Sequence, residues 1–132
     1  MKNKSLLFLF LLIPLLANAG VSREFLNALA RVESSNNPKA YNPGENAIGI
    51  YQIRKAYFID AQRIDKSLIK YKHEDCFNPE IAERVVNAYL SRYCKSNSFE
   101  DMARCHNSGP NWKNKKDLTN KYWKKIQKEL AK

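Results

Sequence analysis

Glu33 stands where an apolar helix pattern gives way to a polar segment, and it is the residue of this sequence best placed for acid chemistry. Leu29 and Leu26 lie four and seven residues before it, so its carboxyl group continues their apolar stripe. Burial disfavours the charged form of a carboxylic acid, and an acid that keeps its proton can protonate a leaving group. The alternative is an ordinary solvated glutamate at the end of a helix.

Three short blocks carry polar residues in a fixed order along the chain. They are Glu33-Ser34, then Gly49-Ile50-Tyr51-Gln52, then Cys105-His106-Asn107. Each block by itself is weak, but their order and spacing together resemble the motif series of the soluble lytic transglycosylase (SLT) domain in the lysozyme-like superfamily. That series is usually written Glu-Ser, Gly-Leu-Met-Gln and Ala-Tyr-Asn. The resemblance covers essentially the whole chain after residue 19.

The resemblance implies a mainly α-helical, lysozyme-like single domain, of the α+β kind with minimal strand content. It also implies a peptidoglycan lytic transglycosylase that needs no cofactor and no metal. In that reaction Glu33 first protonates the β-1,4 bond between N-acetylmuramic acid and N-acetylglucosamine. The same residue then takes the proton of the muramoyl C6 hydroxyl, which attacks C1 and leaves a 1,6-anhydro product. One glutamate would serve as acid and then as base.

The resemblance also implies a set of residues that contact the substrate or the acid. His106 replaces a tyrosine that usually holds the acid, Tyr51 replaces a methionine of the sugar groove, and Tyr122 resembles an aromatic that closes over the acid. Each position has a structural alternative: a loop-pinning hydrogen bond, a helix end or core packing. The expected substrate-binding set is Ser34, Tyr51, Gln52, His106, Asn107 and Tyr122.

A hydrolytic lysozyme of the same fold is the alternative enzyme, using Glu33 either with a second carboxylate, as hydrolases usually do, or with a positioned water. Glu45, in the polar loop before the second block, is the possible second carboxylate, and Asp60 is a weaker candidate. Both are also compatible with plain surface charges. A non-catalytic cationic cell-wall-binding protein, and a membrane-active protein that acts through its basic C-terminal helix, are the alternatives from other classes.

The first 19 residues predict a signal peptide. Lys2 and Lys4 precede an apolar run from Leu6 to Leu16, and Ala17-Asn18-Ala19 forms a small-residue cleavage site. The apolar run is too short for a transmembrane anchor. We therefore expect one domain, residues 20–132, that is secreted or periplasmic and has no stable membrane anchor after cleavage.

The expected mature chain is strongly basic. Removing Lys2 and Lys4 from the 23 lysines and arginines leaves a net charge of +8 against 13 acidic residues. Such a surface favours an anionic partner, and export favours peptidoglycan glycan strands over nucleic acid. Small relatives of the SLT type often accompany machines that cross the wall, so a wall-spanning secretion machine is a further expected partner by analogy.

The three cysteines, Cys76, Cys94 and Cys105, predict one disulfide and one remaining thiol in an exported protein. Cys76 and Cys94 flank a predicted helix of roughly 25 Å, at about 1.5 Å per residue, which separates them too far to pair. Pairing therefore involves Cys105, with either partner open. A zinc site with His106 is disfavoured because no pair of cysteines has the usual two-residue spacing.

Capping signals and apolar periodicity place the elements that position these residues. Helices are expected over 23–34 with a Ser22 cap, over 55–64, from Pro79 behind an Asn78 cap, behind a Ser98 cap, and over 118–130. Residues 35–46 read as a loop, and residues 47–53 are compatible with a short strand or a helix start. The helix over 55–64 is expected to bury Phe58, Ile59 and Ile64. Residues 65–77 have no clear pattern.

Overall fold

The computed structural model describes residues 20–132, and the predicted signal peptide lies outside the described residues. The described chain is mainly helical with one two-stranded sheet, as expected. Three turns of 3-10 helix, η1 to η3, join the longer helices. In chain order the elements are α1 (Arg23–Ser34), β1 (Tyr41–Asn42), β2 (Ala47–Ile48), α2 (Lys55–Ile64), η1 (Lys66–Lys70), η2 (His73–Phe77), α3 (Pro79–Tyr93), α4 (Phe99–Ser108), η3 (Trp112–Lys115) and α5 (Lys116–Leu130).

Side-chain caps start three of the helices where the sequence predicts them. The Ser22 hydroxyl accepts a hydrogen bond from the backbone N–H of Phe25 at 3.3 Å. Asn78 accepts from the N–H of Glu80 at 2.9 Å with a proline at the first turn of α3, and Ser98 caps α4 in the same way. These bonds satisfy amide groups that have no partner inside the helix.

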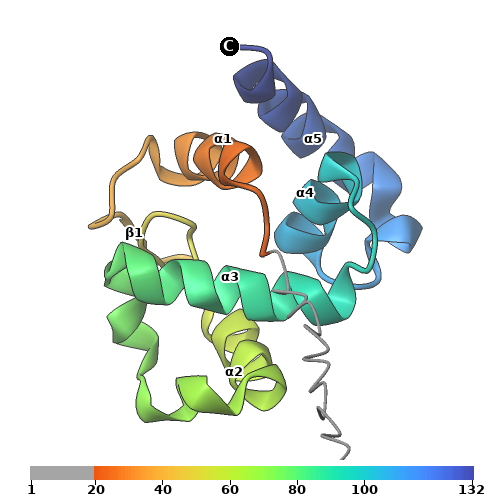
Figure 1. Cartoon of the computed structure of the whole chain (residues 1–132). Coiled ribbons are helices and arrows are strands. Elements are labelled where there is room, and N and C mark those ends of the chain that lie inside the picture. Colours follow the sequence, from red (N-terminus) through yellow and green to blue (C-terminus); the bar gives the residue numbers. More distant parts are fainter. Residues whose placement is uncertain (1–19) are drawn as a thin grey trace, which may run out of the picture.

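Helix α3 is the central element of the fold. It packs against α2 and η2 along one part of its length and against α4 along another, while α5 packs against α1 and α4. Figure 1 shows α3 crossing the middle of the molecule, with α2 below it and α1, α4 and α5 above. The fully buried apolar side chains come from every α-helix and include Phe25, Leu29, Val85, Leu90 and Ile126.

The segment before α2 folds as a hairpin followed by a tight turn. Strands β1 and β2 are antiparallel, with Tyr41 opposite Ile48. Gly49 then adopts a φ of 77°, and a Cβ atom there would clash with the carbonyl oxygen of Cys76 in η2. Only glycine combines this backbone conformation with such a close approach. The turn that carries Tyr51 and Gln52 is thereby fixed against η2.

Four details differ from the sequence-based expectation. Strand β1 lies within the expected loop over 35–46, and Ile64 is only partly buried. Ile59 is 37% exposed, so its predicted burial is wrong. The buried face of α2 is formed by Phe58 and Ala61, because successive helical residues point about 100° apart and only one face meets α3. Helix α5 also begins at Lys116, two residues earlier than predicted. Within residues 20–132, no helix is both long and apolar enough to cross a bilayer.

Candidate active site

Glu33 lies in the last turn of α1 and lines a small polar cavity. The Glu33 side chain is 18% exposed, so it is partly shielded from water but still reaches the cavity. The cavity has a volume of about 180 Å³ and is built from α1, the β1–β2 hairpin, the turn before α2, the first turn of α2 and the end of α4. Its lining residues are Glu33, Asn42, Glu45, Gln52, Arg54, Tyr57, His106 and Asn107.

Tyr122 holds Glu33 from behind the cavity. The Tyr122 hydroxyl, on α5, donates a hydrogen bond of 2.7 Å to Glu33 Oε1, although Tyr122 does not itself line the cavity. Burial, and then the neighbouring Glu33, raise the pKa of Tyr122 well above its usual range. Tyr122 is therefore a neutral donor to the carboxyl group. Its place fits a positioning role better than the substrate contact expected from the sequence.

The His106 ring also lies close to Glu33 Oε1. Its Nε2 lies 3.1 Å from the carbonyl oxygen of Tyr51 and 3.4 Å from Glu33 Oε1, while its Nδ1 lies 3.0 Å from the Tyr57 hydroxyl. A carbonyl oxygen only accepts, so Nε2 must carry a proton. With that proton on Nε2, Nδ1 can accept from the Tyr57 hydroxyl while Nε2 donates to the Tyr51 carbonyl oxygen and lies beside Glu33 Oε1. This arrangement holds the ring against the Glu33 carboxyl group.

Ser34 and Gln52 shape the walls of the site through backbone contacts. The Ser34 hydroxyl lies 2.8 Å from the carbonyl oxygen of Ile50 and accepts from the N–H of Asn37, so it ties the end of α1 to two loops. Ser34 does not line the cavity. Gln52 does line it, but its amide nitrogen donates to the carbonyl oxygen of Gly49 at 3.0 Å. The contacts of Ser34 match its structural alternative, the end of a helix. Gln52 pins a loop and also faces the cavity, so its position is compatible with both roles.

Tyr51 is not brought into the cavity. Its side chain is 4% exposed, and the charges nearest its hydroxyl belong to Arg23 and Glu83. Those two residues form an ion pair at 2.6 Å on the surface of α1 and α3. The backbone of Tyr51 reaches the site instead, because its carbonyl oxygen receives the His106 ring nitrogen.

Of the two candidates for a second carboxylate, Glu45 shares the cavity with Glu33 and Asp60 does not. Glu45 lies in the loop between β1 and β2 and is exposed, so it is free to meet a ligand. Asp60 lies on α2, where its carboxylate pairs with Arg63 at 3.1 Å on the surface.

Three cavity residues, Asn42, Arg54 and Tyr57, were missed by the sequence reasoning. Arg54 donates to the backbone carbonyl of Asn107 at 3.0 Å and brings a positive charge beside the two carboxylates. Tyr57 stacks on Tyr89 of α3, with ring centroids 3.6 Å apart. Its position four residues after the Gly-x-x-Gln-Ile block was the available signal, but the pattern of the predicted helix over 55–64 pointed to Phe58, Ile59 and Ile64 instead. Asn42 had no sequence signal.

Among residues 20–132, no group of three or more histidine, cysteine or acidic side chains is placed to bind a metal ion. The chemistry derived below uses side chains and water.

The family model named Destabilase matches residues 22–129, and the chain belongs to this family. Lysozyme 1 of Crassostrea virginica is 30% identical, and the match covers 87% of this chain and 66% of that protein. A chain in the crystal structure of Aeromonas hydrophila PliI in complex with Meretrix lusoria lysozyme is also 30% identical, with a TM-score of 0.69 over 82% of this chain and 89% of that one. Tapes japonica lysozyme is 27% identical, with a TM-score of 0.68 over 81% and 89%.

These findings correct the expected family. The assignment to the SLT transglycosylases is wrong, because the match over 22–129 is to Destabilase and the relatives are named lysozymes. The lysozyme-like fold is confirmed. The three sequence blocks belong to the helix end, the tight turn and the α4 terminus that line the cavity, so they reflect a shared fold and do not distinguish the two families. The expected secretion machine rested on the SLT analogy and is withdrawn with it.

Proposed function

We propose that this chain is a lysozyme that hydrolyses the β-1,4 bond between N-acetylmuramic acid and N-acetylglucosamine in peptidoglycan. The observation that carries the proposal is the pair of carboxylic acids in one polar cavity, with one of them, Glu33, held by Tyr122 and His106. Membership in a family with lysozyme relatives supports the substrate class. The chain spans 66% of the length of the Crassostrea lysozyme, close to two thirds.

In this mechanism Glu33 is the general acid. Its Oε1 accepts a hydrogen bond from the Tyr122 hydroxyl, and among residues 20–132 no side chain forms a hydrogen bond with Oε2. The transferable proton therefore sits on Oε2, from which it passes to the glycosidic oxygen as the bond to the sugar breaks. The developing positive charge on that sugar is stabilised by a carboxylate on its other side.

Glu45 is the second carboxylate of the proposed mechanism. Glu45 either attacks the sugar directly or activates the water that does so. Direct attack requires a separation of about 5–5.5 Å between the two carboxyl groups, and activation of water requires about 6.5–9.5 Å. Its loop is exposed, so a glycan strand can reach it from solvent. Arg54, Gln52 and Asn107 line the same cavity and are the proposed contacts for sugar hydroxyl and acetamido groups.

Export and charge fit this substrate. A protein with a predicted signal peptide meets peptidoglycan outside the cytoplasm, and a net charge of +8 for residues 20–132 favours association with an anionic wall. Helix α5 carries many of the lysines, but it also packs against α1 and α4 through the fully buried Ile126. That packing argues against a free membrane-inserting helix.

The test is digestion of purified sacculi, followed by mass spectrometry of the released muropeptides. The wild-type chain should release products with ordinary reducing ends, and Glu33→Gln should lower the rate by about 10²–10⁴-fold, the usual worth of a general acid. Glu45→Gln should also lower the rate strongly. Asp60→Asn is the matched control and should leave the rate unchanged, because Asp60 lies outside the cavity.

Four results would contradict the proposal, each at a different point. Products that lack one water would exclude hydrolysis as the main reaction. Release by Glu33→Gln at the wild-type rate would remove the acid from the mechanism. A wild-type rate for Glu45→Gln would show that Glu45 is not the second carboxylate and that another group activates the water. Binding to sacculi without any release would indicate a wall-binding protein.

A further inference from the structure

Cys94 and Cys105 are neighbours in the structure although they belong to different helices. Cys94 is the C-terminal cap of α3, and Cys105 lies inside α4, which packs against α3. The packing of α3 on α4 brings the two thiols close enough for each to shift the pKa of the other, so the two side chains are neighbours. All three cysteines are free thiols in this structure. The pair is therefore seen in its reduced form.

The remaining cysteine is placed where it cannot join this pair. Cys76 lies in η2, before the start of α3, whereas Cys94 lies at the opposite end of the same helix. Cys76 is fully buried beneath the tight turn at Gly49. Burial, followed by the charges of Asp75 and Glu74, raises the pKa of the Cys76 thiol to about 12, so it is an unreactive thiol.

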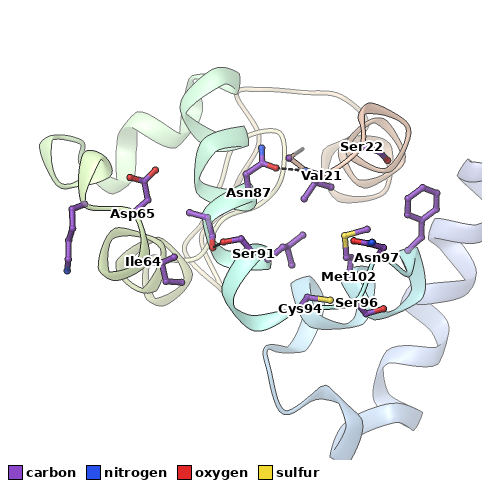
Figure 2. A pocket seen from close by; sticks show the side chains of 15 residues that line it. Val21, Ser22, Ile64, Asp65, Asn87, Ser91, Cys94, Ser96, Asn97 and Met102 are labelled. Atoms are coloured by element: carbon purple, nitrogen blue, oxygen red, sulfur yellow. Dashed lines mark hydrogen bonds between the residues drawn. The ribbon is translucent and has the colours of Figure 1, made fainter. Parts of the chain in front are cut away.

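The two thiols of the pair differ in access to solvent. Cys94 is partly exposed and lines a cavity of about 730 Å³ that is separate from the candidate active site. Figure 2 shows its sulfur beside Ser96 and Met102 in the wall of this cavity. Cys105 is fully buried behind it. An external disulfide can therefore reach Cys94 first.

The electrostatics of the pair favour the same order of reaction. The neighbouring Cys105 thiol lowers the pKa of Cys94, against the opposing effect of burial, and the backbone N–H of Ser96 adds to the lowering. The neighbouring Cys94 thiol and burial raise the pKa of Cys105. Since the thiolate is the attacking species, Cys94 is the nucleophile and Cys105 the resolving thiol.

We propose that Cys94 and Cys105 are a redox pair that forms a disulfide between the end of α3 and the middle of α4. The oxidant is a disulfide compound of an oxidising compartment, such as glutathione disulfide. The Cys94 thiolate attacks one sulfur of that disulfide, forms a mixed disulfide and expels one thiolate. Cys105 then loses its proton, attacks Cys94 Sγ and expels the second thiolate. Two thiols and one external disulfide thus become one protein disulfide and two external thiols.

The backbone around the pair allows the bond to form. Cys94 has left the helix, with φ of −128° and ψ of 87°, and the residues from Lys95 to Asn97 between α3 and α4 are not helical. The disulfide would close a loop of about 12 residues, counted from Cys94 to Cys105. Cys105 directly precedes His106, so the disulfide would also fix the end of α4 that supports Glu33.

The test compares the folded chain after equilibration in glutathione disulfide with the same chain in a reducing buffer. Alkylation after the oxidised chain has been unfolded in denaturant at a pH that blocks disulfide exchange, followed by peptide mapping, should show one modified thiol, Cys76, and a linked peptide that contains Cys94 and Cys105. The melting temperature of the oxidised chain should exceed that of the reduced chain by on the order of 10 °C, as expected for a loop of this size in a domain of this length.

Matched variants separate the pair from the third cysteine. Cys76→Ser should keep the full difference in melting temperature between the two buffers, whereas Cys94→Ser and Cys105→Ser should each abolish it. Three alkylatable thiols after oxidation, or a linked peptide that contains Cys76, would overturn the proposal. These readouts do not depend on the proposed lysozyme activity.

Discussion

Tyr122 and His106 approach the same oxygen of Glu33, Oε1, at 2.7 and 3.4 Å. The Tyr122 hydrogen bond, with the His106 ring packed beside the same oxygen, fixes the plane of the carboxyl group and leaves Oε2 for the transferable proton. The second partners of His106 are the Tyr57 hydroxyl and the Tyr51 carbonyl, so the orientation of Glu33 depends on α2, α4, α5 and the turn before α2. The position of Glu33 Oε1 is therefore set by four segments of the chain.

Tyr122→Phe removes the hydroxyl that binds Glu33 and keeps the ring. We expect kcat to fall by about 10- to 100-fold with little change in KM, because a hydrogen bond to the charge that develops on the carboxylate as the proton leaves is worth about 1.5–3 kcal/mol, and Tyr122 does not line the cavity. Kinetics on a soluble glycan substrate would measure this. Tyr93→Phe, a partly buried tyrosine at the end of α3, is the control. A rise in KM at constant kcat would instead assign Tyr122 to substrate binding.

At the scale of elements, the tight turn between β2 and α2 is the part that brings the hairpin and its carboxylate to the site. Gly49 sits at a φ of 77° directly against the backbone of Cys76, and its N–H donates to the carbonyl oxygen of Ala40 at 2.8 Å. The turn also aims the Tyr51 carbonyl at His106. A shift here would move Glu45, Gln52 and the His106 contact together.

Gly49→Ala should destabilise the fold by roughly 3 kcal/mol or more, since it adds both strain at positive φ and a clash with the Cys76 carbonyl. Gly44→Ala, in the same hairpin, should cost less than about 1 kcal/mol because its Cβ would meet only the Asn42 side chain at 3.4 Å. Urea unfolding of both variants measures the difference. Equal stabilities would show that the turn relaxes freely, contrary to this description.

At the scale of the whole molecule, helices on both sides of α3 bury polar tyrosines beside the site. Burial is the main cause that raises the pKa of Tyr57 and of Tyr122 well above their usual range, with Glu33 adding to both. In the unfolded chain a tyrosine ionises near pH 10, roughly the value of model peptides. Folding therefore keeps protons on these hydroxyls that the unfolded chain releases.

The consequence is a loss of stability in alkali. Above about pH 10 the unfolded state binds fewer protons than the folded state, so the free energy of unfolding falls by about 1.4 kcal/mol per pH unit for each buried tyrosine. Below that pH the contribution of both tyrosines is fully present. Urea unfolding between about pH 9 and pH 11 should give a slope shallower by about this amount in Tyr122→Phe than in the wild type. Identical slopes would place the ionisation of Tyr122 in the usual range.

The sequence by itself determined the helices and the acid. The caps at Ser22, Asn78 and Ser98 are local interactions, and the apolar stripe that ends at Glu33 is a local pattern. Both can therefore be predicted from residues that are close together in the sequence. The same reading predicted that Cys105 is needed for any disulfide. It failed at Ile59, whose exposure depends on the face that α2 turns toward α3.

Only the tertiary structure decided which polar residues share the site. It placed Glu45, Asn42, Arg54 and Tyr57 around Glu33, and it turned Tyr51 away from them. These outcomes depend on contacts between segments far apart in the chain, such as the contact between Glu33 and Tyr122, which are 89 positions apart. The three short sequence blocks reflect the local backbone conformations of a lysozyme-like fold. The family and the groups that face the acid follow from how the whole chain packs around them.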